Sequence, residues 1–103
     1  MTGKGLNGKK ISGNLCVCHS NEDLKSFKDG DIIVAADTTN EMMAQMRQAS
    51  ALIVEAEGAN CHAAIAGLSL DIPVLIGAKH ALDVLKSSAY VELDCENGLV
   101  TAN

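Results

Sequence analysis

Three short apolar runs, rich in Ile and Val, divide the chain and limit the folds that it can adopt. They cover residues 31–36, 52–55 and 74–76. A continuous apolar run of this length is typical of a strand that is covered on both faces of its sheet. Segments with helical periodicity separate the runs, and strands that alternate with helices favour an α/β fold with parallel strands.

Four helices are predicted outside these runs. Thr38 and Glu41 have the spacing of a capping box, and methionines then recur at helical spacing. A short helix is expected over residues 24–27, another from His62 onward, and a last one over residues 79–86. Helices in these places would cover the faces of a parallel sheet.

The two ends of the chain differ in character. Residues 1–13 are rich in Gly and Lys, which is typical of a linker that leads into a domain, and residues 14–103 are expected to form that domain. Residues 14–18 predict its first strand. Asn97 and Gly98 lie between two apolar segments near the end of the chain, which predicts a C-terminal hairpin.

The composition argues against several classes of partner. The net charge of −5 argues against nucleic-acid binding, which needs clustered Lys and Arg, and the two aromatic residues, Phe27 and Tyr90, leave little for base stacking. No apolar run approaches the roughly 20 residues of a membrane span, and no secretory signal pattern is found. A cytoplasmic protein that binds neither nucleic acid nor membrane is therefore expected.

The four cysteines predict packing rather than chemistry. Cys16, Cys18, Cys61 and Cys95 include no Cys-x-x-Cys pair, and reduced, buried thiols are the simplest interpretation without a secretory signal. Cys16 and Cys18, followed directly by His19, suggest a metal site, but a fourth ligand is not evident. We therefore expect the thiols to be core residues and expect no metal site.

His62 has the clearest potential for chemistry, because it lies where a Gly-bearing loop becomes a helix. A helix N-terminus has unpaired N–H groups and a partial positive charge, so phosphate or sulfate is a candidate ligand there. A neutral His ring is also a nucleophile near pH 7. The predicted anion-binding residues are Gly58, Asn60, Cys61 and His62: the glycine gives the loop freedom, and the Asn amide can cap the helix or donate. His62 is the candidate catalytic residue, as a phospho-acceptor, and the alternative is a packed, hydrogen-bonded histidine.

The loop also carries a resemblance to a known family. Residues 57–64 read Glu-Gly-Ala-Asn-Cys-His-Ala-Ala. They resemble the phosphohistidine loop in the mobile domain of phosphoenolpyruvate (PEP)-utilising enzymes, whose pattern is Gly-Gly-x-Thr-Ser/Cys-His-Ala-Ala. Residues 63–74 are closest to one branch, the extra C-terminal domain of certain bacterial pyruvate kinases. The dikinase and synthase branches usually place an Arg a few residues after the His, where this chain has Gly67 and Leu68. Nearly the whole chain shares in the resemblance, since residues 3–6, 30–34 and 39–43 are similar to the pyruvate kinase branch as well.

The resemblance implies a fold and a role. The fold would be the three-layer swivelling β/β/α domain, with two β-layers and one helical layer. The role would be that of a non-catalytic C-terminal module of pyruvate kinase, a glycolytic phosphotransferase, acting through subunit contacts, stability or regulation. Its partners would be the parent kinase catalytic domain and its subunits. Mg and K ions would be cofactors only in that parent domain, with none in this one. A catalytic barrel of about 250 residues does not fit in this chain, so no autonomous activity is expected.

Two departures from the family pattern favour the non-catalytic role. Glu57 stands where the family has Gly, which brings a carboxylate near the expected phosphate, and Asn60 stands where it has Thr. The alternative is a phosphocarrier in which His62 is transiently phosphorylated from PEP. The remaining histidines, His19 and His80, are assigned no role, and Asp37 is interpreted as a loop residue.

Overall fold

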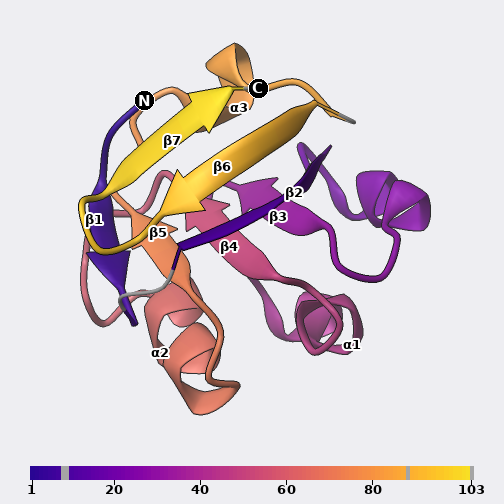
Figure 1. The fold of residues 1–103 in the computed structure, drawn as a ribbon. Helices are drawn as coiled ribbons and strands as arrows, with labels where there is room; N and C mark the ends of the chain where they lie inside the picture. Colours follow the sequence, from indigo (N-terminus) through magenta and orange to yellow (C-terminus); the bar gives the residue numbers. More distant parts are fainter. Residues whose placement is uncertain (8–9, 88, 103) are drawn as a thin grey trace.

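The strands form one mixed sheet that bends over itself in the computed structural model, which describes residues 1–7, 10–87 and 89–102 (Figure 1). The strand order is β1-β5-β4-β3-β2-β6-β7. The strands are β1 (Lys4–Leu6), β2 (Lys10–Val17), β3 (Ile32–Ala35), β4 (Ala51–Val54), β5 (Val74–Ile76), β6 (Tyr90–Asp94) and β7 (Leu99–Ala102).

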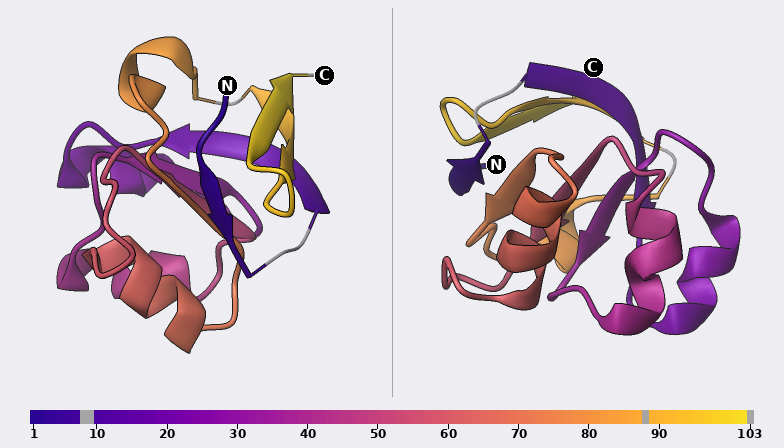
Figure 2. Two further views of the ribbon diagram at one scale, coloured as in Figure 1. Left: turned by 90° about the vertical axis from the view of Figure 1, so that its left-hand side faces the viewer. Right: turned by 90° about the horizontal axis from the view of Figure 1, so that it is seen from below.

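Strand β2 belongs to two layers, and this produces the bend. Its first part, residues 10–14, pairs antiparallel with β6, whereas residues 15–17 pair parallel with β3. The β6–β7 hairpin therefore covers one face of the sheet that β1 to β5 form. The α1 and α2 helices lie on the opposite face (Figures 1 and 2). The predicted three-layer β/β/α arrangement, with parallel strands and a C-terminal hairpin, is confirmed.

The helices are short. Two are 3₁₀ helices, η1 (Asn21–Ser26) and η2 (Asn40–Met42), and three are α-helices, α1 (Met43–Met46), α2 (His62–Ser69) and α3 (Ala81–Val84). The predicted helices over 24–27 and 79–86 thus exist with shifted or shorter bounds. None of the helices in the described part of the chain is long and apolar enough to cross a bilayer.

Alternate residues of each central strand enter different cores. In β3, Ile33 and Ala35 pack with the helical layer, while Ile32 and Val34 pack between the sheet and the hairpin. All four are buried, which explains why the run is apolar throughout. Met42 and Met46 are buried in the helical core, so these two methionines serve as core residues.

Residues 1–13 were predicted to be a linker or a domain entry, and where the structure describes them they are part of the sheet and not a linker. Residues 4–6 form β1, which pairs antiparallel with β5, and residues 10–13 begin β2. Both strands begin with an exposed Lys, and in β2 the exposed residues Lys10, Ser12 and Asn14 alternate with less exposed ones. A search for continuous apolar runs therefore misses these strands. Residues 8 and 9 of that segment lie outside the described residues, as do 88 and 103 of the predicted domain.

A glycine substitution tests whether β1 is part of the fold. A Cβ atom at Gly5 would overlap the backbone carbonyl of Cys95. We expect Gly5→Ala to lower the free energy of unfolding by about 1–3 kcal/mol, the usual cost of overpacking, as measured by urea denaturation. Lys4→Ala, at the exposed neighbouring position, is the control and should change it by less than about 0.5 kcal/mol. Equal effects of the two substitutions would contradict the assignment.

Candidate functional site

Two parallel strands bring the site together. Strands β3 and β4 are parallel neighbours, so the segments that follow them begin at the same edge of the sheet. The segment after β3 carries Asp37, Thr38 and Asn40, and the loop after β4 leads to His62, the first residue of α2. Side chains separated by more than 20 positions therefore meet at the start of this helix.

The carboxylate of Asp37 caps α2. Its Oδ2 accepts a hydrogen bond from the backbone N–H of His62 at 3.2 Å, and its Oδ1 accepts one from Ala63 at 2.9 Å. Oδ1 also accepts the N–H of Thr38 at 2.8 Å. The N-cap residue is Cys61, whose side chain makes no capping bond, so the suggestion that Asn60 caps the helix is corrected. A negative charge at this position is favourable because it lies against the positive end of the helix dipole.

Both ring nitrogens of His62 have partners from the segment after β3. Nδ1 lies 2.7 Å from the hydroxyl oxygen of Thr38, and Nε2 lies 2.9 Å from Oδ1 of Asn40. Thr38 is only 3% exposed. The capping box predicted for Thr38 is therefore wrong: Thr39 is the N-cap of η2, without a side-chain bond, and the Thr38 hydroxyl faces the histidine.

His62 is one of the residues that line an apolar groove between α1 and α2. The groove has a volume of about 330 Å³ and is lined by Asn40, Met43, His62, Ile65, Ala66 and Ser69. Ile65 is 60% exposed, and Leu68 on the same helix is 51% exposed. Asn40, which is hydrogen-bonded to Nε2 of His62, also lines this groove.

The other predicted site residues lie beside the histidine. Gly58 and Asn60 are exposed in the loop, and Cys61 is half-buried. The carbonyl of Gly58 accepts the N–H of Cys61 at 3.0 Å, which shapes the turn before the helix. None of their side chains is bonded to the ring of His62 among the described residues. Anion binding by this loop stays a prediction.

Asp37, Thr38 and Asn40 were missed as site residues in the sequence. Asp37 and Thr38 were given local roles, in a loop and in a capping box. The available signal was the order of parallel strands, because polar residues directly after one buried strand can reach a helix that follows the adjacent strand.

Comparison with known proteins identifies the family. The model of the family described as "PEP-utilising enzyme, mobile domain" matches residues 27–98. This chain belongs to that family. The mobile domain is 37% identical over 99 residues to a pyruvate kinase of Bacillus licheniformis, a match that covers 95% of this chain and 17% of the kinase. It is 35% identical over 100 residues to a probable phosphoenolpyruvate synthase of Archaeoglobus fulgidus, covering 97% of this chain and 13% of the synthase. The chain thus spans less than a fifth of either relative.

Solved structures support the fold of the mobile domain. A solution structure of Enzyme I aligns with a TM-score of 0.63 and 24% identity, covering 78% of this chain and 33% of that one. The crystal structure of Thermococcus kodakaraensis aconitase X aligns with a TM-score of 0.73 and 18% identity, covering 99% and 96% of the two chains. At these identities the likeness concerns the fold alone.

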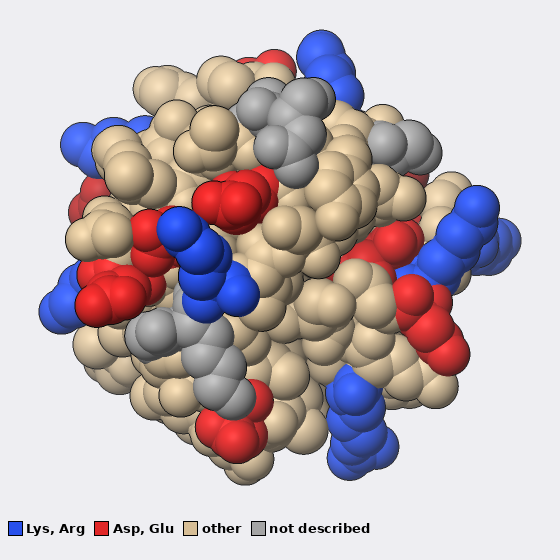
Figure 3. Space-filling model, viewed as in Figure 1, with Lys and Arg blue, Asp and Glu red and all other residues tan. Residues whose placement is uncertain are grey.

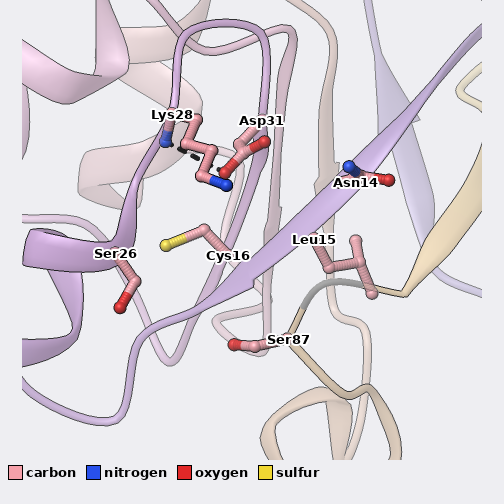
Figure 4. A pocket seen from close by; sticks show the side chains of 7 residues that line it. All are labelled: Asn14, Leu15, Cys16, Ser26, Lys28, Asp31 and Ser87. Atoms are coloured by element: carbon pink, nitrogen blue, oxygen red, sulfur yellow. Dashed lines mark hydrogen bonds between the residues drawn. The ribbon is translucent and has the colours of Figure 1, made fainter.

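A second, smaller pocket lies beside β2 (Figure 4). It has a volume of about 50 Å³ and is lined by Asn14, Leu15, Cys16, Ser26, Lys28, Asp31 and Ser87. The backbone N–H of Lys28 donates to Asp31 Oδ2 at 3.0 Å across its rim. This volume suits a few water molecules and is too small for a substrate such as PEP.

The cysteines of the mobile domain are free thiols. The predicted burial is confirmed for Cys16, Cys18 and Cys95, but Cys61 is only half-buried. The sulfur atoms of Cys16 and Cys18 lie 3.8 Å apart in the helical core. His19 is exposed, and no group of three His, Cys, Asp or Glu side chains in the described part of the chain is arranged to hold a metal ion. Burial raises the pKa of Cys18 to about 12 and the pKa of Cys95 to about 11, and it also raises the pKa of Cys16.

The face of the molecule drawn in Figure 3 has no cluster of Lys and Arg side chains. Acidic and basic side chains are interspersed there and separated by uncharged surface. This face therefore lacks the electrostatic footprint of a nucleic-acid-binding surface.

The cap formed by Asp37 predicts a stability effect. We expect Asp37→Ala to lower the free energy of unfolding by about 1–2 kcal/mol at pH 7, because two helix N–H groups lose their acceptor. Urea denaturation measures this. Asp29→Ala removes the same charge from an exposed turn and is the matched control. If both variants lose the same stability, Asp37 is not the cap.

The buried thiols predict a pattern of alkylation. Because the thiolate is the reactive form, iodoacetamide at pH 8 should modify Cys61 first and leave Cys16, Cys18 and Cys95 intact in the folded protein. Mass spectrometry of peptides over time gives the order. In denaturant all four should react at similar rates. Rapid modification of Cys18 in the folded protein would contradict the burial of that thiol.

Proposed function

We propose that this mobile domain is a non-catalytic module of a PEP-utilising enzyme of the pyruvate kinase type, acting through subunit contacts, stability or regulation. The observation that supports this most is that the polar groups around His62 are paired within the domain. The ring nitrogens face Thr38 and Asn40, and the first helix N–H groups bond to Asp37. A site built to receive a phosphoryl group would keep donors available for its charge.

The residues after His62 support the same role. Dikinases and synthases of this family usually carry an Arg there, which suits a phosphate. Gly67 is buried against β5, where a Cβ atom would overlap the side chain of Val74, and Leu68 is exposed. Neither residue offers a cation to a phosphoryl group on His62.

The proposal extends to cofactors, partners and location. The partners are the parent kinase catalytic domain and its subunits. The Mg and K ions of kinase chemistry belong to that parent domain, and this domain takes no cofactor. A cytoplasmic location is part of the same proposal.

One specific observation favours a second function, that of a phosphocarrier. His62 lines the groove between α1 and α2 together with Asn40, the partner of its Nε2, and a phosphoryl donor could approach the histidine there. Because Asp37 occupies the helix N–H groups of His62 and Ala63, the transferred phosphoryl group would depend on cations supplied by a partner domain. The module and the carrier therefore differ in what His62 contributes to turnover.

Substitution of His62 in the native full-length protein distinguishes the two functions. For a non-catalytic module, His62→Ala and His62→Gln should leave kcat and KM for PEP within about twofold, because the histidine touches no reacting atom. Steady-state kinetics measure this, with His80→Ala, an exposed histidine at the start of α3, as the matched control. Circular dichroism checks that the variants are folded.

A carrier gives the opposite result. Loss of turnover by more than about a hundredfold in both His62 variants, together with an acid-labile phosphate on His62 after incubation with PEP, would reject the module and support the carrier.

A further inference from the structure

The turn between β6 and β7 has two features that favour a spontaneous chemical change. Asn97 is exposed, and Gly98 follows it directly. The backbone nitrogen of the next residue can attack an asparagine amide, and glycine hinders this attack least because it has no Cβ atom. The backbone N–H of Gly98 donates no hydrogen bond to a described residue, so no such bond holds its nitrogen away from the amide.

The carboxylate of Asp94 holds the amide of Asn97. Its Oδ1 accepts the backbone N–H of Asn97 at 3.1 Å. Its Oδ2 lies 2.8 Å from Nδ2 of the same residue, and a carboxylate only accepts, so the amide NH₂ group is the donor. The side-chain bond and then the backbone bond from Asn97 hold the pKa of the Asp94 carboxyl below its usual value. Loss of Asp94 would therefore leave the amide freer to turn toward Gly98.

The same turn joins the hairpin to residues 1–3, beside β1 (Figure 1). The backbone N–H of Gly3 donates to the carbonyl of Gly98 at 2.9 Å, and the N–H of Val100 donates to the carbonyl of Met1 at 2.9 Å. Gly98 has a φ of 69°, and a Cβ atom there would overlap the carbonyl oxygen of Gly3. A change in the backbone next to Gly98 would therefore disturb a close contact.

We propose that Asn97 is a site of spontaneous deamidation, that Asp94 slows this reaction, and that the modified turn loosens the contact between the hairpin and residues 1–3. The inference does not rest on the proposed function, because it involves no residue of the His62 site. It gives the mobile domain a modification that lowers its stability as the protein ages.

The reaction needs only water. The backbone nitrogen of Gly98 forms a bond to Cγ of Asn97, the bond from Cγ to Nδ2 breaks, and the proton of the attacking nitrogen leaves with ammonia. Water then opens the cyclic imide at one of its two carbonyl groups, which gives aspartate or isoaspartate. Either product replaces an amide that donates to Asp94 by a carboxylate that repels it. Isoaspartate also adds a methylene group to the backbone of the turn.

The first readout is the rate of deamidation in the folded chain at neutral pH, followed by mass spectrometry of the peptide that contains Asn97. The wild type should gain the small mass of an amide that becomes an acid. Asp94→Ala should react about two- to tenfold faster, which corresponds to the loss of one hydrogen bond. Glu92→Ala removes a carboxylate from the same strand and leaves both bonds of Asn97 in place, so it is the matched control, with the wild-type rate.

The second readout is the midpoint of urea denaturation. Asn97→Asp reproduces the aspartate product and should lower the midpoint, because two carboxylates then face each other in the turn. Asn14→Asp adds the same charge at an exposed position of β2 and is the matched control, with the wild-type midpoint.

Each part of the inference can fail separately. If Asn97 stays intact in the folded wild type while it deamidates in the denatured chain, it is not a deamidation site of this protein. Equal rates in Asp94→Ala and the wild type would overturn the role of Asp94. An unchanged midpoint in Asn97→Asp would overturn the effect on the hairpin.

Discussion

The interaction on which the site depends is the bond between the carboxylate of Asp37 and the first N–H groups of α2. Helix α2 has only eight residues and would not persist alone. It is held by this cap and by close packing on the sheet, where Ala63, Ala64 and Gly67 are buried. The same bond ties the end of β3 to the start of α2, and so fixes Thr38 and Asn40 next to His62.

Under the proposed function, this arrangement lets a member of the PEP-utilising mobile domain family keep its histidine without using it as a phospho-acceptor. The helix start would suit an anion, but the chain provides that anion itself. The imidazole ring could act as a nucleophile, but its Nε2 atom is hydrogen-bonded to Asn40. In our account the histidine has a structural role: its hydrogen bonds connect the segment after β3 to the segment after β4.

The sequence predicted most of the fold, because its strongest signals are local. Strand β5, Val74–Ile76, has the predicted bounds because three apolar residues follow a proline. The hairpin followed from Asn97 and Gly98, and Gly98 has a positive φ of 69°. Strand β1 was missed because only three residues form it, and they owe their conformation to pairing with β5, far along the chain.

The site was harder to predict than the fold, because its contacts are long-range. His62 was recognised from the loop pattern around it. Thr38 was misassigned because a Thr three residues before a Glu fits a local capping box, and the pattern carries no information on a histidine 24 residues away. Asn60 is closer in sequence to the start of α2, yet Asp37 caps the helix. The parallel pairing of β3 and β4 places the carboxylate of Asp37 next to the first N–H groups of α2.

The measurement that tests this account most directly is a titration of the mobile domain with inorganic phosphate, followed through the backbone N–H signals of His62 and Ala63 by proton–nitrogen NMR. If Asp37 occupies these groups, their chemical shifts should stay unchanged while phosphate rises to tens of millimolar at constant pH and ionic strength, about the range in which weak anion sites fill. Saturable shifts of both signals would show that the helix start is open to an anion, and would contradict the claim that the site is closed by its own carboxylate.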